Sequence, residues 1–240
     1  MYKFILSLLI FAEPLAAADF QPPAGCEAFL TVQSKGCEVS IYYRCSADPE
    51  GYQWRQDFGV NGKTYEALID ANGRWLQSKS FASGVSKILT GEEPDPASLP
   101  QLLKSGRDTM EFEQIDSEGV VHHYKGYDSL TGETVVLDGQ PLLRSEFSFT
   151  EWDGEGQFVR QVRGNEYVSE TFGRFFGGQI VVEEASGDSY PVDSAPIDFI
   201  LPGEPGYGST IPLYQCTDMM SFYHGPAQPQ ISNEKTGGAS

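Results

Sequence analysis

Basic residues are scarce in this sequence of 240 residues. It has 16 Lys and Arg against 34 Asp and Glu, which gives a formal net charge of −18 at pH 7. A protein whose main task is to bind nucleic acid needs a basic surface that displaces counterions from the phosphate backbone. Adhesion to anionic lipid surfaces has the same requirement. The charge therefore argues against both tasks, and we expect no nucleic-acid partner.

Long apolar runs and histidines are also few. Beyond the first residues, no run approaches the ~18 apolar residues of a membrane-spanning helix, so we expect no membrane span. The sequence has three His and no G-x-S-x-G motif, which leaves few anchors for a Ser-His-Asp triad. We identify no catalytic residue and no cofactor, and the sequence favours a protein that is not an enzyme.

The N-terminus has the features of a secretory signal peptide. Lys3 supplies a positive charge, the apolar segment 4–11 follows it, and Pro14 ends that segment. The small residues 16–18 then form a cleavage site. We expect residues 1–18 to be removed after Ala18 and the protein to be periplasmic or secreted.

Four cysteines follow, at positions that an oxidising compartment would pair into two disulfides. They are Cys26, Cys37, Cys45 and Cys216. A hairpin around Lys35-Gly36 places Cys26 opposite Cys45, at a separation that a disulfide can bridge, and leaves Cys37 for Cys216. We favour this pairing, and the sequence leaves the other two connectivities open.

Lipidation of Cys26 is an alternative for the N-terminal region. Ala24-Gly25-Cys26 resembles the end of a lipobox, the motif that precedes a lipid-modified cysteine. Pro23 stands where Leu is usual, and Pro14 and Asp19 separate Cys26 from the apolar segment. The sequence therefore favours a cleaved signal peptide over a lipid anchor.

The rest of the chain is a succession of short strand patterns divided by turn residues. The dipeptide Asn61-Gly62 predicts a tight hairpin turn. In that hairpin Phe58 would lie opposite Tyr65 and Trp54 opposite Ile69, so all four would share one buried face. Ile69 would in turn lie opposite Leu76 in the next hairpin.

Two further hairpins are predicted in the middle of the chain. A three-residue loop that ends in glycine places Phe112 opposite Tyr124. The turn Asp138-Gly139 places Val135 opposite Leu142.

One segment, 96–105, is predicted to be a short helix. Asp95 suits its N-cap, Pro96 its first position and Gly106 the residue that ends it. The apolar stripe of this helix would consist of Leu99, Leu102 and Leu103.

These patterns predict an all-β fold. We expect a single antiparallel up-and-down meander of roughly a dozen strands, forming a curved half-barrel, a barrel or a sandwich. Residues 19–224 would form one domain, and 225–240 a disordered tail.

Three patterns invite a metal interpretation. The adjacent His122 and His123 would point to opposite faces of a strand and could not share one ion. Cys216, Met219, Met220 and His224 are soft ligands that suit copper, but their order is not that of a blue-copper site and Cys216 is needed for a disulfide. The Asp-rich turns lack the ligand series of a calcium loop. We therefore predict no metal site.

Several segments together resemble an uncharacterised family of exported proteins from marine alphaproteobacteria. They are Cys37-Glu38-Val39-Ser40, Asp95-Pro96-Ala97-Ser98, Thr131-Gly132-Glu133-Thr134, the segment 199–206 and Cys216-Thr217-Asp218-Met219-Met220. The resemblance covers most of the mature chain and implies a periplasmic setting, but it implies no activity. In outline, a meander with one helix is also similar to the open half-barrels of periplasmic lipoprotein carriers.

Our leading hypothesis is a non-enzymatic binding or envelope-associated protein. It would hold an apolar small molecule, or an envelope protein, on the concave face of its sheet. The tentative ligand-contacting residues are Trp54, Phe58, Tyr65 and Trp75. One alternative is a hydrolase that uses carboxylates or His123, and another is a structural or interaction protein of the envelope.

Overall fold

The computed structural model describes residues 19–91 and 93–216. The predicted signal peptide (1–18), the predicted tail (225–240) and Met219, Met220 and His224 lie outside the described residues. Within the described ranges, no helix is long and apolar enough to cross a membrane.

Antiparallel strands make up most of the described chain, as predicted. In chain order the elements are β1 (Cys26–Ser34), β2 (Glu38–Cys45), β3 (Gln53–Gly59), β4 (Gly62–Ile69), β5 (Trp75–Ser80), β6 (Ser86–Leu89), α1 (Leu99–Ser105), β7 (Arg107–Asp116), β8 (Val121–Leu137), β9 (Gln140–Asp153), β10 (Phe158–Ser169), β11 (Arg174–Phe176), β12 (Gln179–Glu184), β13 (Ser189–Asp193) and β14 (Pro196–Ile200).

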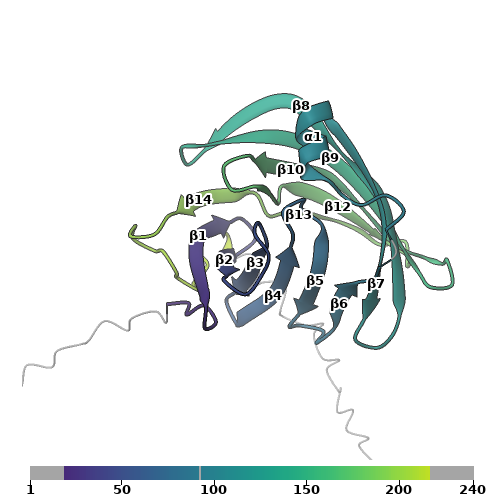
Figure 1. The fold of residues 1–240 in the computed structure, drawn as a ribbon, viewed down its shortest axis with the longest axis horizontal. Coiled ribbons are helices and arrows are strands. Elements are labelled where there is room, and N and C mark those ends of the chain that lie inside the picture. The colour runs from purple at the N-terminus through teal and green to yellow at the C-terminus, as the bar shows by residue number, and fades with distance from the viewer. Residues whose placement is uncertain (1–18, 92, 217–240) are drawn as a thin grey trace, which may run out of the picture.

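All the strands belong to one sheet, in the order β13-β12-β10-β9-β8-β7-β6-β5-β4-β3-β2-β1-β14, with β11 paired to β10 beside this path. The sheet is curved and does not close (Figure 1). Of the three architectures that the sequence allowed, the structure is the open curved one. Its two edge strands, β13 and β14, are consecutive in the chain, so the sheet curls until its edges approach each other.

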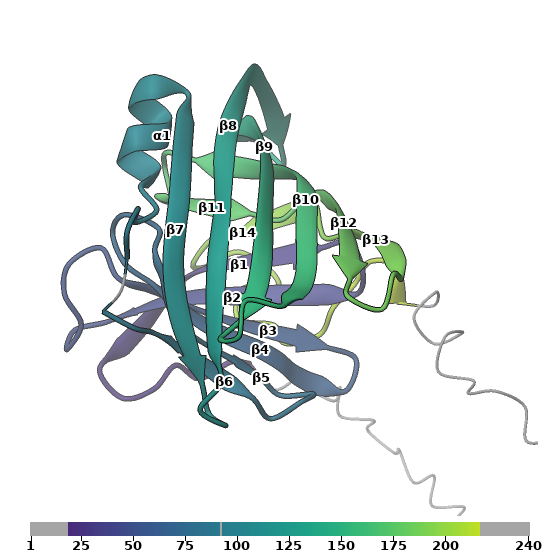
Figure 2. The same cartoon turned by 90° about the vertical axis from the view of Figure 1, so that its right-hand side faces the viewer.

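The long strands β7–β10 cross the strands β1–β3 steeply, and the concave faces of the two groups look toward each other (Figure 2). Alternate residues of β7 are buried, as the two-residue period of a strand requires. The concave side of β7–β10 and β12 carries one apolar cluster, composed of Met110, Phe112, Tyr124, Phe147, Phe149, Val162 and Val182. A second cluster, composed of Leu30, Val32, Tyr42, Leu142, Phe172, Phe176 and Phe199, fills the space between β1, β2, β9, β11 and β14.

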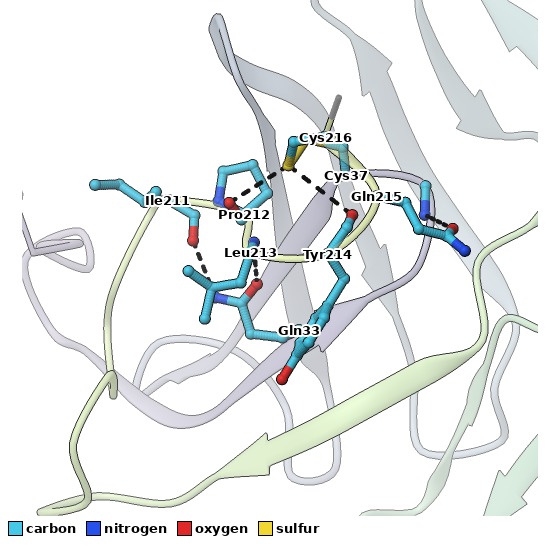
Figure 3. The surroundings of a disulfide bond; sticks show 9 residues. Gln33, Cys37, Ile211, Pro212, Leu213, Tyr214, Gln215 and Cys216 are labelled. Carbon is cyan, nitrogen blue, oxygen red and sulfur yellow. Dashed lines mark hydrogen bonds between the residues drawn. A yellow bond between two sulfur atoms is a disulfide. The ribbon is translucent and has the colours of Figure 1, made fainter. Parts of the chain in front are cut away.

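The convex face of β1–β3 is also covered. Phe20 packs there against Tyr43 and Phe58, with ring centroids 5.6 and 6.0 Å apart. The C-terminal segment lies along β1, where the buried Gln33 donates to the carbonyl of Ile211 at 3.0 Å and accepts from the amide of Leu213 at 3.0 Å (Figure 3). The sheet is therefore covered on both faces at β1–β3, which explains why more than half of the residues in each of these strands are buried.

Both disulfides have the predicted pairing. Cys26 is bonded to Cys45, and Cys37 to Cys216, which ties the C-terminal segment to the first hairpin (Figure 3). The sulfur of Cys26 is thus occupied by a disulfide. The two bonds indicate an oxidising, exported environment.

The predicted register of the next hairpin is wrong. Tyr65 lies opposite Asp57 instead of Phe58, and Trp54 lies opposite Leu68 instead of Ile69. The turn consists of Val60 and Asn61 instead of Asn61 and Gly62, because Gly59 lies opposite Gly62, and a bulge between Asp57 and Phe58 then shifts the pairing again. One extra residue reverses which side chains share a face.

In the following pair the predicted register holds from Leu68, which lies opposite Gln77, and fails only at Ile69. A bulge between Leu68 and Ile69 places Ile69 opposite Trp75 instead of Leu76. Later in the chain, Phe112 opposite Tyr124 and Val135 opposite Leu142 are confirmed.

The helix begins later than predicted. It spans Leu99–Ser105, its N-cap is Ser98, and Gly106 ends it in the left-handed conformation, as predicted. Asp95 instead forms a β-bridge with Glu111 of β7. Pro100 fits the first turn, where no backbone donor is needed. The predicted apolar stripe packs at the end of the sheet, where Leu99 and Leu102 join Val168.

Candidate binding cavity on the concave face

A cavity lies on the concave face between α1 and the strands β7–β10. The volume of the cavity is about 60 Å³, which is room for a small ligand or a few waters. Its lining is composed of Asn72, Gly73, Arg74, Trp75, Leu89, Glu93, Ala97, Ser98, Leu99, Asp108, Met110, Phe112, Asp128, Phe147, Phe149, Glu166 and Phe175. The cavity thus combines five aromatic rings with four carboxyl groups.

Strand register brings this lining together. Asp108 lies opposite Asp128, and Met110 opposite Gly126, across β7 and β8. Asp128 in turn lies opposite Phe147 on β9. Gly126 has no side chain to fill this row, and a Cβ there would collide with Phe149 at 2.7 Å from its Cβ. The missing side chain lets the aromatic ring of Phe149 pack close to the sheet.

Trp75 lies at the exposed edge of the aromatic part of this lining. It is 41% exposed. Its ring meets those of Phe112 and Phe149 edge-on, with centroid separations of 5.8 and 5.6 Å and interplanar angles of 83° and 82°. Edge-to-face packing of this kind is favourable.

The start of the helix closes one end of the cavity. The amide of Ser98 donates to the carboxylate of Asp108 at 2.7 Å, and the amide of Leu99 donates to the carbonyl of Asn72 at 2.8 Å. Burial raises the pKa of Asp108, and the Ser98 hydrogen bond opposes that rise. Asp108 therefore both borders the cavity and holds the helix in place.

Two further carboxyl groups of the cavity have strongly raised pKa values. Burial, and then the neighbouring Asp108, raise the pKa of Asp128 to about 7. Burial, and then Asp128, raise the pKa of Glu166 to about 8, while Arg55 opposes that rise. Glu166 keeps some accessible surface because it borders the cavity, although it lies deep within the curved sheet.

A second group of acids occupies the other end of the same strands. Glu151 is 2% exposed and contacts Lys87 Nζ at 2.7 Å, Arg160 Nε at 2.7 Å and His122 Nδ1 at 2.8 Å. His122 Nε2 also lies 3.0 Å from Asp116. Burial alone would raise the pKa of Glu151, but Arg160 and Lys87 more than offset it and the pKa is lowered. We call these residues the Glu151 cluster.

The four aromatic residues predicted to contact a ligand do not lie together. Trp75 lines the cavity. Tyr65 lies beside Arg55, whose guanidinium carbon is 5.1 Å from its ring centroid. Trp54 stacks on Tyr43 at 6.0 Å, and Phe58 packs on Phe20, both on the convex face. The bulge at Asp57 and Phe58 is the cause of this separation.

The adjacent histidines point to opposite faces, as expected. His122 faces inward and meets the charged groups Asp116 and Glu151. His123 is 41% exposed by side chain and lies 2.9 Å from Glu113. Among residues 19–91 and 93–216, no group of three or more His, Cys, Asp or Glu side chains is placed to hold a metal ion.

Sequence reasoning missed Asp108, Asp128 and Glu166. A signal for the first two was present, because the hairpin that pairs Phe112 with Tyr124 also pairs Asp108 with Asp128. Two like charges directly opposite on a buried face destabilise a sheet unless something compensates them. Such a pair is a feature to look for in any predicted register.

Comparison of the chain with protein-family models, with curated proteins and with solved structures found no match.

Proposed function

We propose that the protein is an exported, periplasmic binding protein that holds a small ligand with an apolar body in the cavity beside α1. The observation that carries this proposal is the wall formed by Trp75, Phe112, Phe147, Phe149 and Phe175. Binding sites for small molecules are typically concave and apolar, with a few converging polar groups. The carboxyl groups of this cavity are such polar groups.

The compartment supports the same proposal. Two disulfides suit an oxidising environment, and the predicted signal peptide would direct the chain there. The formal charge of −18 would keep such a protein soluble without a partner.

Nuclear magnetic resonance of the tryptophan indole N–H groups tests the proposal. Benzyl alcohol, a small neutral aromatic probe, should shift the signal of Trp75 in a saturable way. It should leave the signal of Trp54, on the convex face, unchanged. The variants Trp75→Phe and Trp54→Phe assign the two signals. A probe that shifts neither signal, or shifts both equally, would refute a ligand site in this cavity.

A second candidate function is a carboxylate-dependent hydrolase. It is favoured by Asp128 and Glu166, two acids that share one concavity and have raised pKa values. Acid–base hydrolysis requires a pair of this kind, one protonated and one ionised. His123 supports no such role, because its side chain pairs with Glu113 on β7 and does not line the cavity.

Chromogenic aryl glycosides and aryl esters separate this candidate from binding alone. If the protein only binds, it should release no product above the buffer rate. Turnover that is abolished by Asp128→Asn would establish the hydrolase instead.

A further inference from the structure

The charges that border the cavity are strongly unbalanced. Glu93, Asp108, Asp128 and Glu166 face one base, Arg74. The guanidinium of Arg74 is already engaged, with Asp70 at 2.7 Å and Glu93 at 2.8 Å. Asp108 has the Ser98 amide as its partner. The two acids that remain inside the cavity are Asp128 and Glu166, and Arg55 compensates the charge of Glu166 in part.

Asp128 is the most informative of these groups. It is 7% exposed and lines the cavity. No residue of the described chain gives it a hydrogen bond or an ion pair, and its cross-strand neighbour is another acid, Asp108. Burying a carboxyl group without a partner costs free energy. A ligand that brings a positive charge or a donor would recover that cost.

The aromatic wall favours one kind of donor. Trp75 stands edge-on to Phe112 and to Phe149, and all three rings line the cavity. The faces of aromatic rings attract cations, most strongly where water is excluded. Carboxylates on one side and ring faces on the other are the combination that recognises ammonium groups on apolar bodies.

We propose that the cavity selects a small organic cation, an amine or quaternary ammonium group carried on an apolar body. The cation lies beside Asp128 and Glu166, and the apolar body contacts Trp75, Phe112 and Phe149. The ligand class rests on the proposed binding function, but it can fail while that function stands.

The affinity for such a ligand depends on pH. The titratable and charged groups around the pair Asp128 and Glu166 are Asp108 from β7, Arg55 from β3, beside Glu166, and Arg74 and Glu93 from the loops at the rim. A cation favours the ionised carboxylate, so binding releases a proton wherever the free group is protonated. Affinity should therefore rise as pH passes from about 6 to about 8.

Benzylamine and benzyl alcohol provide matched probes, because they have the same size and differ in charge. We expect calorimetry at about pH 8 to show benzylamine binding at least ~10-fold more tightly than benzyl alcohol. The advantage should shrink at about pH 6 and be reduced in Asp128→Asn, in which Glu166 is the remaining carboxyl group beside the cation. Glu111→Gln is the control, because Glu111 is an acid of β7 that pairs with Lys125 and does not line the cavity.

Two outcomes overturn the proposal. Benzylamine that binds no more tightly than benzyl alcohol excludes cation selection, and binding of the alcohol alone would leave the proposed function intact. An advantage that Asp128→Asn retains in full would exclude the assigned site. If Asp128→Asn does not fold, the wild-type protein alone still tests the proposal. Calorimetry in two buffers of different ionisation enthalpy must show proton release near pH 7, and its absence refutes the proposal.

Discussion

The strands β7–β10 carry two groups of buried acids on one concave face, and the two groups differ in whether basic side chains neutralise their charge. Glu151, at one end, meets Lys87, Arg160 and His122 within 2.8 Å. Asp128, toward the other end, meets no basic group of residues 19–91 and 93–216 and faces a cavity. The pKa of Glu151 is lowered and the pKa of Asp128 is raised to about 7.

The difference distinguishes an acid with a structural role, Glu151, from an acid that borders the candidate site, Asp128. A buried carboxylate whose charge is neutralised by neighbours from β6, β8 and β10 holds those strands together. A buried carboxyl group with no partner contributes nothing to folding and costs stability when it ionises. Its retention beside a cavity is what a binding function requires, because function is paid for in stability elsewhere in the molecule.

Removal of the carboxylate of Glu151 should have the largest effect on stability. Glu151→Gln leaves Lys87 and Arg160 without their anion, and we expect a loss of about 2 kcal/mol in the free energy of unfolding, below the usual cost because Arg160 stays partly in solvent. Denaturant unfolding measures it. Glu155→Gln, in the exposed loop after β9, should change less than about 0.5 kcal/mol. Equal effects in the two variants would contradict a structural role for Glu151.

Stability should fall with rising pH because folding raises the pKa of three buried carboxyl groups, the two of the cavity and Glu38 of β2. Glu38 and Asp128 have pKa values of about 7, and Glu166 about 8. A carboxyl group whose pKa is raised by folding keeps its proton longer in the folded state, so stability falls as pH rises from the unfolded value near 4 to the folded value.

Thermal unfolding at a series of pH values tests this sign. The melting temperature should be highest on the acid side of neutrality and should decrease by several degrees between about pH 5 and about pH 8. A melting temperature that increases throughout this range would show that Asp128 and Glu166 ionise at ordinary pH values in the folded protein.

The smallest expected effect is a gain in stability. Asp128→Asn keeps the shape of the neutral side chain and removes its ionisation, so we expect it to stabilise the ligand-free protein by about 1 kcal/mol at about pH 8. Near pH 4 the variant and the wild type should be equally stable. Destabilisation of the same size at both pH values would mean that Asp128 has a structural partner.

The sequence predicted those parts of the fold that depend on local signals. The loop before β8 determined the pairing of Phe112 with Tyr124, and the opposition of Cys26 and Cys45 led to both disulfides. The registers of Trp54 and Ile69 failed because bulges depend on packing between strands and have no clear signature in the sequence.

The candidate site was harder to predict for the same reason. Asp108 and Asp128 follow from a predicted hairpin, but Glu166 joins them only through the curvature of the sheet across β9. Likewise, Glu151 could be recognised as a structural acid only with its partner Lys87, which is 64 residues away in the chain. Compositional reasoning treated all 34 acids alike, and the structure separates them by their neighbours.

The most direct test of this account is a carbon-13 titration of the side-chain carboxyl groups of the ligand-free protein. The account predicts midpoints near pH 7 for Asp128 and near pH 8 for Glu166, with Glu151 below the ordinary range of glutamate. Midpoints near pH 4 for all three groups, the ordinary value of a solvated carboxyl group, would contradict it.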